Sequence, residues 1–183
     1  MARLIILDRD GVINFDSPAF IKSPEEWRPL PGALDAIADL KHVGWQVAVC
    51  SNQSGVGRGL IPPEKLEAIH ACLHQALAAR GVYLDGLTFC PHRPDEDCSC
   101  RKPLPGMLIE TMIQLDASPA NTVVIGDSLR DIQAGLAAGC RCILVRTGNG
   151  RAAEASVRAL GITEVFDDLR VAADKLLGEL PCL

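Results

Sequence analysis

The stretch Leu4-Ile5-Ile6-Leu7-Asp8-Arg9-Asp10-Gly11 decides the fold. Four aliphatic residues followed by a turn signal are typical of a short buried strand. Side chains alternate along an extended chain, so Asp8 and Asp10 would point to one side at the carboxyl end of this strand. In an open α/β sheet, ligands bind outside the carboxyl ends of the strands. Because two close carboxylates repel each other, the pair predicts a cation, a shared proton or both, with a polar turn as the simpler alternative.

Strand-like and helix-like segments alternate along the rest of the chain. The predicted strands are 3–8, 46–51, 87–90, 122–126 and 142–145. The predicted helices are 32–43, 62–80, 106–115 and 129–138, followed by two helical segments in the C-terminal tail. This alternation predicts an α/β fold with a Rossmann-like, doubly wound parallel sheet. We expect residues 1–183 to form one domain, with a flap at about 9–31 and an inserted cysteine-rich loop at about 90–102.

Composition and charge narrow the possible partners. The chain has 18 basic and 23 acidic residues and a net charge of −5, which argues against an extended nucleic-acid surface. No stretch is long and apolar enough to cross a bilayer, and the N-terminus begins with a strand rather than a signal peptide. We therefore expect a cytoplasmic monomer whose partner is a small molecule, with no nucleic acid and no membrane.

The eight cysteines divide into a cluster and a scattered set. In a reducing cytosol disulfides are not expected, so the scattered residues are predicted to be small core side chains. They are Cys50, Cys72, Cys140, Cys142 and Cys182.

Three further motifs carry groups suited to an anion. The segment Ser51–Gly59, SNQSGVGRG, offers hydroxyl, amide and backbone N–H groups but lacks the ending of a Walker loop, and a glycine-rich turn is the alternative. Asp127 and Asp131 follow the predicted strand at 122–126, although helix capping alone would explain Asp131. Arg101 and Lys102 supply a planar fork and a point charge, both suited to phosphate.

Together these motifs predict a phosphoryl-transfer site. Asp8, Ser51 and Asp127 each lie at the carboxyl end of a different predicted strand. The carboxylates of Asp8, Asp10 and Asp127 favour Mg²⁺, a hard cation that also binds phosphate oxygens. Ser51 and Lys102 would hold the remaining phosphoryl oxygens.

The segments DRDG, SNQSG, RKP and GDSLRD, in that order, resemble the four motifs of the haloacid dehalogenase (HAD) superfamily phosphatases. The resemblance covers nearly the whole chain. Within the superfamily, SNQSGVGRG, the cysteine-rich loop and CRKPLPGML are most similar to the phosphatases that remove the C7 phosphate of D-glycero-D-manno-heptose 1,7-bisphosphate. Those enzymes serve ADP-heptose and lipopolysaccharide core biosynthesis. The resemblance implies the HAD fold and Mg²⁺-dependent hydrolysis through an aspartyl-phosphate. The segments between the motifs leave no room for a large cap domain, which argues against a phosphomutase.

The resemblance also implies a role for each motif residue. Asp8 would be the nucleophile, and Asp10 the general acid and then the general base. Mg²⁺ would be held by the Asp8 side chain, the Asp10 carbonyl and Asp127, while Ser51 and Lys102 stabilise the transferred phosphoryl group. The residues that would contact substrate are Asp16, Ser17, Pro18, Ala19, Asn52, Gln53, Ser54 and Arg101. One departure is Ser128, which stands where many relatives have a lysine.

The cysteine-rich loop has the composition of a structural zinc site. Cys90, His92, Cys98 and Cys100 form a C-x-H-x5-C-x-C pattern, which supplies three thiolates and one imidazole. A closed shell of four protein ligands leaves the metal no position for chemistry. Zinc would instead order the loop and thereby fix the basic pair that follows its last ligand.

Two alternative functions remain. A histidinol-phosphate phosphatase would share the chemistry and a similar zinc loop, and turnover of both substrates would separate the two enzymes. A non-catalytic module that binds a phosphorylated ligand would be expected to lack Asp8 or Asp10, and both are present.

Overall fold

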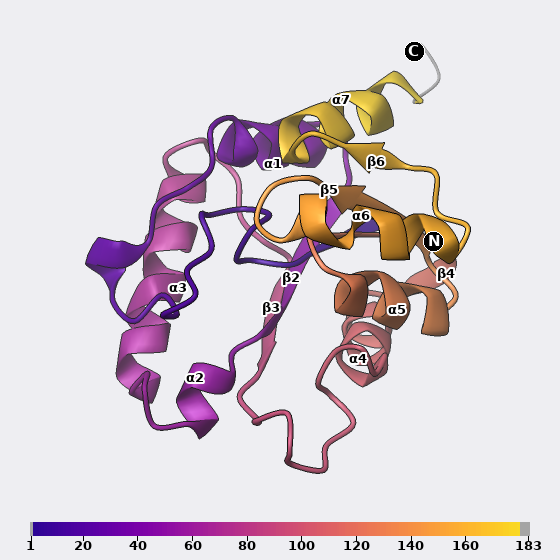
Figure 1. The fold of residues 1–183 in the computed structure, drawn as a ribbon. Coiled ribbons are helices and arrows are strands. Elements are labelled where there is room, and N and C mark those ends of the chain that lie inside the picture. Colours follow the sequence, from indigo (N-terminus) through magenta and orange to yellow (C-terminus); the bar gives the residue numbers. More distant parts are fainter. Residues whose placement is uncertain (1, 180–183) are drawn as a thin grey trace.

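The computed structural model describes residues 2–179, and a six-stranded parallel sheet forms its centre (Figure 1). The strand order is β3-β2-β1-β4-β5-β6. The strands are β1 (Ala2–Leu7), β2 (Gln46–Asn52), β3 (Gly86–Cys90), β4 (Ala117–Gly126), β5 (Arg141–Val145) and β6 (Val165–Phe166). The chain builds outward from β1 to β3 and then returns to add β4 beside β1, so the winding direction reverses between β1 and β4. In sheets of this kind, ligands bind at the point where the winding reverses. The predicted doubly wound α/β fold is confirmed.

Strand β1 is buried on both faces because helices cover both sides of the sheet. Its side chains alternate, so Ile5 and Leu7 contact one hydrophobic cluster while Leu4 and Ile6 contact the other. This two-sided burial explains the continuous aliphatic run that precedes Asp8.

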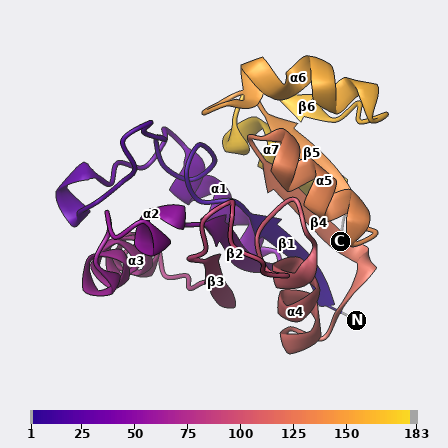
Figure 2. The ribbon, with the colours of Figure 1, turned by 60° about the horizontal axis from the view of Figure 1, so that its bottom comes forward.

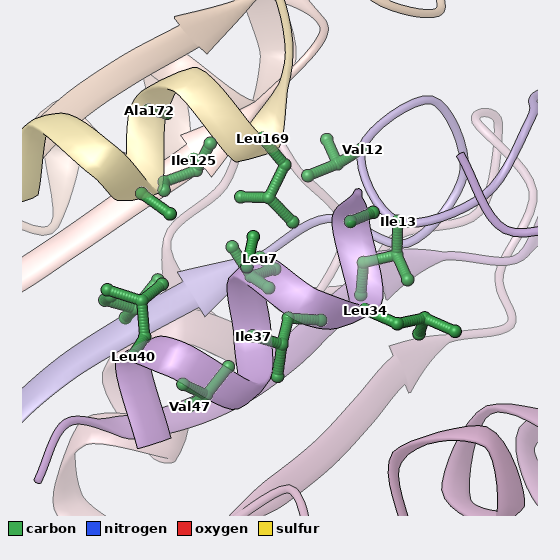
Figure 3. Close-up of a cluster of buried hydrophobic side chains, with 14 of the residues drawn as sticks. Leu7, Val12, Ile13, Leu34, Ile37, Leu40, Val47, Ile125, Leu169 and Ala172 are labelled. Carbon is green, nitrogen blue, oxygen red and sulfur yellow. The ribbon is translucent and has the colours of Figure 1, made fainter. Parts of the chain in front are cut away.

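One face of the sheet is covered by three helices, α1 (Ala33–His42), α3 (Pro63–Ala78) and α7 (Leu169–Gly178). The apolar sides of α1 and α7 pack on each other and on the sheet, where Ile37 and Leu169 lie close to Leu7 (Figure 3). Leu7, Ile37 and Leu169 are each no more than 1% exposed.

The opposite face is covered by α4 (Gly106–Gln114), α5 (Leu129–Ala137) and α6 (Gly150–Ala159) (Figure 2). This second cluster contains the scattered cysteines Cys50, Cys140 and Cys142, which are buried as expected. Cys72 is only half-buried, and Cys182 lies outside the described residues. The seven cysteines within residues 2–179 are all free.

The structure adds short elements that the sequence pattern did not predict. These are a 3₁₀ turn, η1 (Pro24–Glu26), a one-turn helix, α2 (Ser54–Gly57), and the two-residue strand β6. Strand β4 also begins five residues earlier than predicted, and Ala117 pairs with Ala2 there. Within residues 2–179, no helix has both the length and the apolar character needed to cross a membrane.

Candidate active site

A polar cavity of about 290 Å³ opens at the carboxyl edge of the sheet, beside the ends of β1, β2 and β4. Most of the predicted site residues line this cavity. They are Asp8, Asp10, Asp16, Ser17, Ser51, Asn52, Gln53, Ser54, Arg101, Lys102 and Asp127. Pro18 and Ala19 are not among the lining residues.

A buried lysine joins two carboxylates at the base of the cavity. Lys102 is 2% exposed, and its Nζ lies 3.0 Å from Asp8 Oδ1 and 2.6 Å from Asp131 Oδ1, while it donates to the Cys50 carbonyl at 2.7 Å. Burial alone would lower the pKa of Lys102, but the carboxylates of Asp131 and Asp8 outweigh it and raise that pKa. For Asp8, burial outweighs the nearby ammonium and raises the pKa to about 8.

Asp127 completes a group of three carboxylates in the cavity. One carboxylate oxygen each from Asp8, Asp127 and Asp131 lies within 4.8 Å of the others. Burial, with the Asp131 charge adding to it, raises the pKa of Asp127 to about 6 although the Asn149 amide opposes the shift. Three carboxylates lie together here, those of Asp127 and Asp131 buried and that of Asp8 half-buried, and Lys102 is close to two of them. Such a group is typical of a site that takes a divalent ion, because oxygen ligands suit Mg²⁺.

Close backbone approach shapes the surroundings of Asp127. Gly11 has a φ of +83°, and a Cβ atom there would lie 2.2 Å from Asp127 Oδ2. The same carboxylate oxygen accepts hydrogen bonds from the backbone N–H and side-chain amide of Asn149, at 2.8 and 3.2 Å. A residue with a side chain at position 11 would therefore displace a carboxylate that lines the cavity.

Asp131 combines two roles that the sequence left as alternatives. Its Oδ2 accepts hydrogen bonds from the Ser128 backbone N–H at 3.0 Å and from the Ser128 hydroxyl at 2.6 Å, within the capping box that begins α5. Its Oδ1 contacts Lys102. Ser128 therefore helps to fix Asp131 at the start of the helix.

The Asp10 carboxylate is held by four hydrogen-bond donors. Arg9 donates Nε to Oδ1 and Nη2 to Oδ2, both at 2.9 Å, Asn14 donates to Oδ1 at 2.8 Å, and Gln53 donates to Oδ2 at 2.9 Å. Burial would raise the pKa of Asp10, but the Arg9 charge and these hydrogen bonds outweigh it and lower that pKa. Asp8 and Asp10, two residues apart, thus experience opposite pKa shifts.

The loop after β2 is attached to the loop after β3 by a pair of hydrogen bonds. The Asn52 amide donates to the Lys102 carbonyl at 3.0 Å, and its oxygen accepts from the Lys102 N–H at 3.1 Å. Gln53 N–H donates to the Cys90 carbonyl at 2.7 Å, and its side chain donates to the Ser51 hydroxyl at 2.8 Å. The two loops therefore bring Ser51 and Lys102 into one cavity.

The flap reaches the cavity through Asp16, Ser17 and Phe20. Asp16 accepts a hydrogen bond from Asn149 at 3.0 Å, and Phe20 adopts a positive φ of 63° after a turn closed by its N–H to the Ser17 carbonyl. This turn explains why Phe20, rather than Pro18 or Ala19, lines the cavity; Pro18 borders an adjoining hollow. Substrate contact by Pro18 and Ala19 stays a prediction.

The cavity also contains residues that sequence reasoning did not select. Arg58 and Arg130 line it together with Arg101, and Asn149 joins the flap to Asp127. Burial, followed by the charge of Arg130, lowers the pKa of Arg101, so the arginines are close enough to repel one another. Isolated polar residues in loops give no periodic signal, although the RG pair of SNQSGVGRG was visible in the sequence.

Beside the cavity, the predicted zinc ligands converge. The Cys90 and Cys100 sulfurs lie 3.1 Å apart, and the Cys90 and Cys98 sulfurs 3.8 Å apart. His92 Nδ1 lies 3.4 Å from the Cys90 sulfur and 3.3 Å from the Cys100 sulfur. The three sulfurs and the ring nitrogen all lie within 4.8 Å of one another, so the group could hold one metal ion.

The fold and the carboxylate-rich cavity are those of a hydrolase of the HAD class. A family model described as HAD-hydrolase-like matches residues 99–172. The D-glycero-beta-D-manno-heptose-1,7-bisphosphate 7-phosphatase of Bordetella bronchiseptica is 50% identical, covering 97% of this chain and 99% of the relative. The enzyme of the same name from Pseudomonas putida is 48% identical, covering 96% of this chain and 99% of the relative.

Solved structures agree with these relatives. The D,D-heptose 1,7-bisphosphate phosphatase from B. bronchiseptica, complexed with magnesium and phosphate, superposes with a TM-score of 0.90 at 49% identity, covering 97% of this chain and 99% of that one. The corresponding enzyme from Burkholderia thailandensis gives a TM-score of 0.74 at 42% identity, with coverage of 97% and 99%. The chain therefore belongs to the heptose-1,7-bisphosphate 7-phosphatase family of HAD-like hydrolases, as the four motifs predicted.

Proposed function

We propose that this chain hydrolyses the C7 phosphate of D-glycero-beta-D-manno-heptose 1,7-bisphosphate, giving heptose 1-phosphate and inorganic phosphate. The full-length similarity to two enzymes of that name carries this proposal. The shared name also favours the heptose over histidinol phosphate, and the beta anomer over the alpha anomer. The product would enter ADP-heptose formation for the lipopolysaccharide core.

The arrangement of Asp8, Asp10 and Lys102 supports catalysis through a covalent intermediate. An oxygen of the ionised Asp8 carboxylate attacks the C7 phosphorus, the bond from phosphorus to the sugar oxygen breaks, and Asp10, protonated in the substrate complex, gives that oxygen its proton. Asp10 then takes a proton from water as the water oxygen attacks the aspartyl-phosphate, which releases phosphate and restores Asp8. Lys102, within 3.0 Å of Asp8, and Ser51 would stabilise the transferred oxygens.

Magnesium is the catalytic metal that the acidic group fits. Asp8 and Asp127, with the Asp10 carbonyl, would hold it, and when bound it would neutralise charge on the phosphoryl group. The magnesium and phosphate in the Bordetella enzyme support this choice. Asp131, which contacts Lys102, would help to keep the neighbouring carboxylates in place.

Zinc is the metal proposed for Cys90, His92, Cys98 and Cys100, in a structural role. The support is the convergence of three sulfurs and one ring nitrogen within 4.8 Å. Metal analysis of the purified chain tests this proposal and should find about one zinc per chain.

Substrate turnover tests the proposed function directly. The purified chain with Mg²⁺ would be given the beta bisphosphate, the alpha bisphosphate and histidinol phosphate, while phosphorus NMR identifies the phosphate released. We expect the highest kcat/KM for the beta anomer and loss of the C7 phosphate. Asp8→Asn should remove turnover without unfolding the chain, whereas Asp174→Asn, in an exposed ion pair with Arg170, should not affect it. Release of the C1 phosphate, or faster turnover of histidinol phosphate, would refute the proposal.

A further inference from the structure

Arg9 lies between the two site aspartates, and its side chain is completely buried. Burying a guanidinium is costly unless its charge is paired and its N–H groups are hydrogen-bonded. The backbone holds the residue firmly, because the Arg9 carbonyl accepts the N–H groups of Val12, Ile13 and Asn14 at 3.4, 2.8 and 3.2 Å. Within the described residues, its side chain hydrogen-bonds only to Asp10, and Nη1 has no partner.

The donors on Asp10 come from two sides. A carboxylate offers about four lone-pair positions, and the two bonds from Arg9, one from Asn14 and one from Gln53 occupy all four. Gln53 lines the cavity, but Arg9 and Asn14 do not. The bonds from Arg9 and Asn14 therefore hold the carboxylate from behind, and the Oδ2 position occupied by Gln53 faces the cavity.

We propose that Arg9 is a positioning residue that aims one oxygen of Asp10 at the leaving-group oxygen of the substrate. The leaving oxygen takes the position on Oδ2 that the Gln53 amide occupies, while the two-bond fork from Arg9 fixes the plane of the carboxylate. This inference rests on the proposed function, in which Asp10 gives a proton to the departing sugar oxygen.

The fork, rather than the charge alone, is what the geometry requires. Arginine has a planar guanidinium that matches both carboxylate oxygens, whereas a lysine ammonium is a point charge that can rotate about its contacts. Arg9→Lys would keep a cation beside Asp10 but lose the defined plane. A misplacement of about 1 Å at a reacting group can cost about a hundredfold in rate.

The leaving group provides a readout that a purely structural role would not change. A sugar phosphate releases an alkoxide and needs a proton from Asp10, whereas p-nitrophenyl phosphate releases a stable phenolate and needs little help. Because kcat/KM reports the steps up to cleavage of the substrate ester, the later use of Asp10 as a base does not confuse the comparison. We expect Arg9→Lys to lower kcat/KM for the heptose bisphosphate roughly 10- to 100-fold. The value for p-nitrophenyl phosphate should change little.

Four further variants serve as controls for this comparison. Asp10→Asn should show the same selective loss, and adding Arg9→Lys to it should cause no further selective loss, since both act on one proton transfer. Arg141, the first residue of β5, donates two hydrogen bonds to Glu164 and two to Glu179, at the end of that strand away from the cavity. Arg141→Lys disturbs these bonds and should leave kcat/KM for both substrates unchanged. Asn14→Ala removes one donor to Asp10 Oδ1 and should lower kcat/KM for the heptose bisphosphate selectively, by less than Arg9→Lys does. This variant tests the inference even if Arg9→Lys does not fold.

Equal losses on both substrates in Arg9→Lys or Asn14→Ala would overturn the inference, as would unchanged turnover of both. β-Glycerol phosphate is a second alkyl ester. Its kcat/KM, divided by that for p-nitrophenyl phosphate, measures the selective loss without the natural substrate. Failure of the unmodified chain to hydrolyse the heptose bisphosphate would instead refute the proposed function, so the two failures are distinguishable.

Discussion

Replacing Lys102 by methionine tests the electrostatics at the base of the cavity. The substitution keeps an unbranched side chain of similar length but removes the ammonium that lies 3.0 Å from Asp8 and 2.6 Å from Asp131. All three side chains are at most 15% exposed, so water cannot replace the lost cation easily. Removing one partner of a buried ion pair costs about 3–5 kcal/mol, because it leaves an uncompensated charge.

That cost predicts a large change in thermal stability. For a chain of this size, each 1 kcal/mol corresponds to about 2–4 °C, so Tm of Lys102→Met should fall by roughly 6–20 °C. Calorimetry in magnesium-free buffer measures this fall in Tm. Lys175→Met is the matched control, because Lys175 forms an exposed pair with Glu179 at 3.3 Å and its loss should cost less than about 1 kcal/mol.

The stability difference between Lys102→Met and the unmodified chain should depend on pH because of Asp8. Burial already raises the pKa of Asp8 to about 8, and loss of Lys102 would raise it further. A raised carboxyl pKa means that the folded chain binds more protons than the unfolded chain, so stability falls as the pH rises. The difference between Lys102→Met and the unmodified chain should therefore grow from pH 6 to pH 9. A variant as stable as the unmodified chain at pH 9 would refute this reasoning.

Three further predictions concern the core, one histidine and the cysteine loop. Ile37→Ala, at a fully buried site, should lower the free energy of unfolding in urea by about 2–5 kcal/mol, whereas Ile113→Ala, at a site 75% exposed, should cost under about 0.5 kcal/mol. Burial lowers the pKa of His70 to about 4, so the unfolded chain binds the extra proton and stability is lost as the pH falls from 6.5 to 4. His70→Gln should remove roughly 3 kcal/mol of that loss of stability. The same dependence of the unfolding free energy on pH in both proteins would contradict this prediction. Cys98→Ser should reduce bound zinc and Tm, whereas Cys72→Ser, on α3, should keep the metal.

Long periodic elements were predictable because burial imposes their pattern. The first strand and helices α1, α3, α4 and α5 lie within two residues of their predicted bounds. Strand β6 was missed because two residues, Val165 and Phe166, are too few to show alternation. The early start of β4 was missed because it depends on pairing with Ala2, a contact 115 positions away in the sequence.

In the candidate site, the sequence pattern identified the residues at the ends of strands. It did not identify the neighbouring residues that hold those side chains in place. Asp8, Ser51 and Asp127 lie at the carboxyl ends of recognisable strands, so their convergence could be expected from parallel topology. Asn149 and Arg130 come from loops and helix starts where any polar residue is ordinary. The burial of Arg9 was also unpredictable, since an arginine in a turn is usually exposed.

Hydrogen bonds from Gln53 and Asn52 hold the two ends of the cysteine-rich loop against the end of β2. Its ends are anchored, at Cys90 by Gln53 and at Lys102 by Asn52, whereas the outer turn at 94–97 is exposed. Replacing residues in that outer turn would therefore alter the rim of the cavity without moving the ammonium beside Asp8. A protein engineer could diversify this turn to seek new sugar phosphates while the bond-breaking machinery stays unchanged.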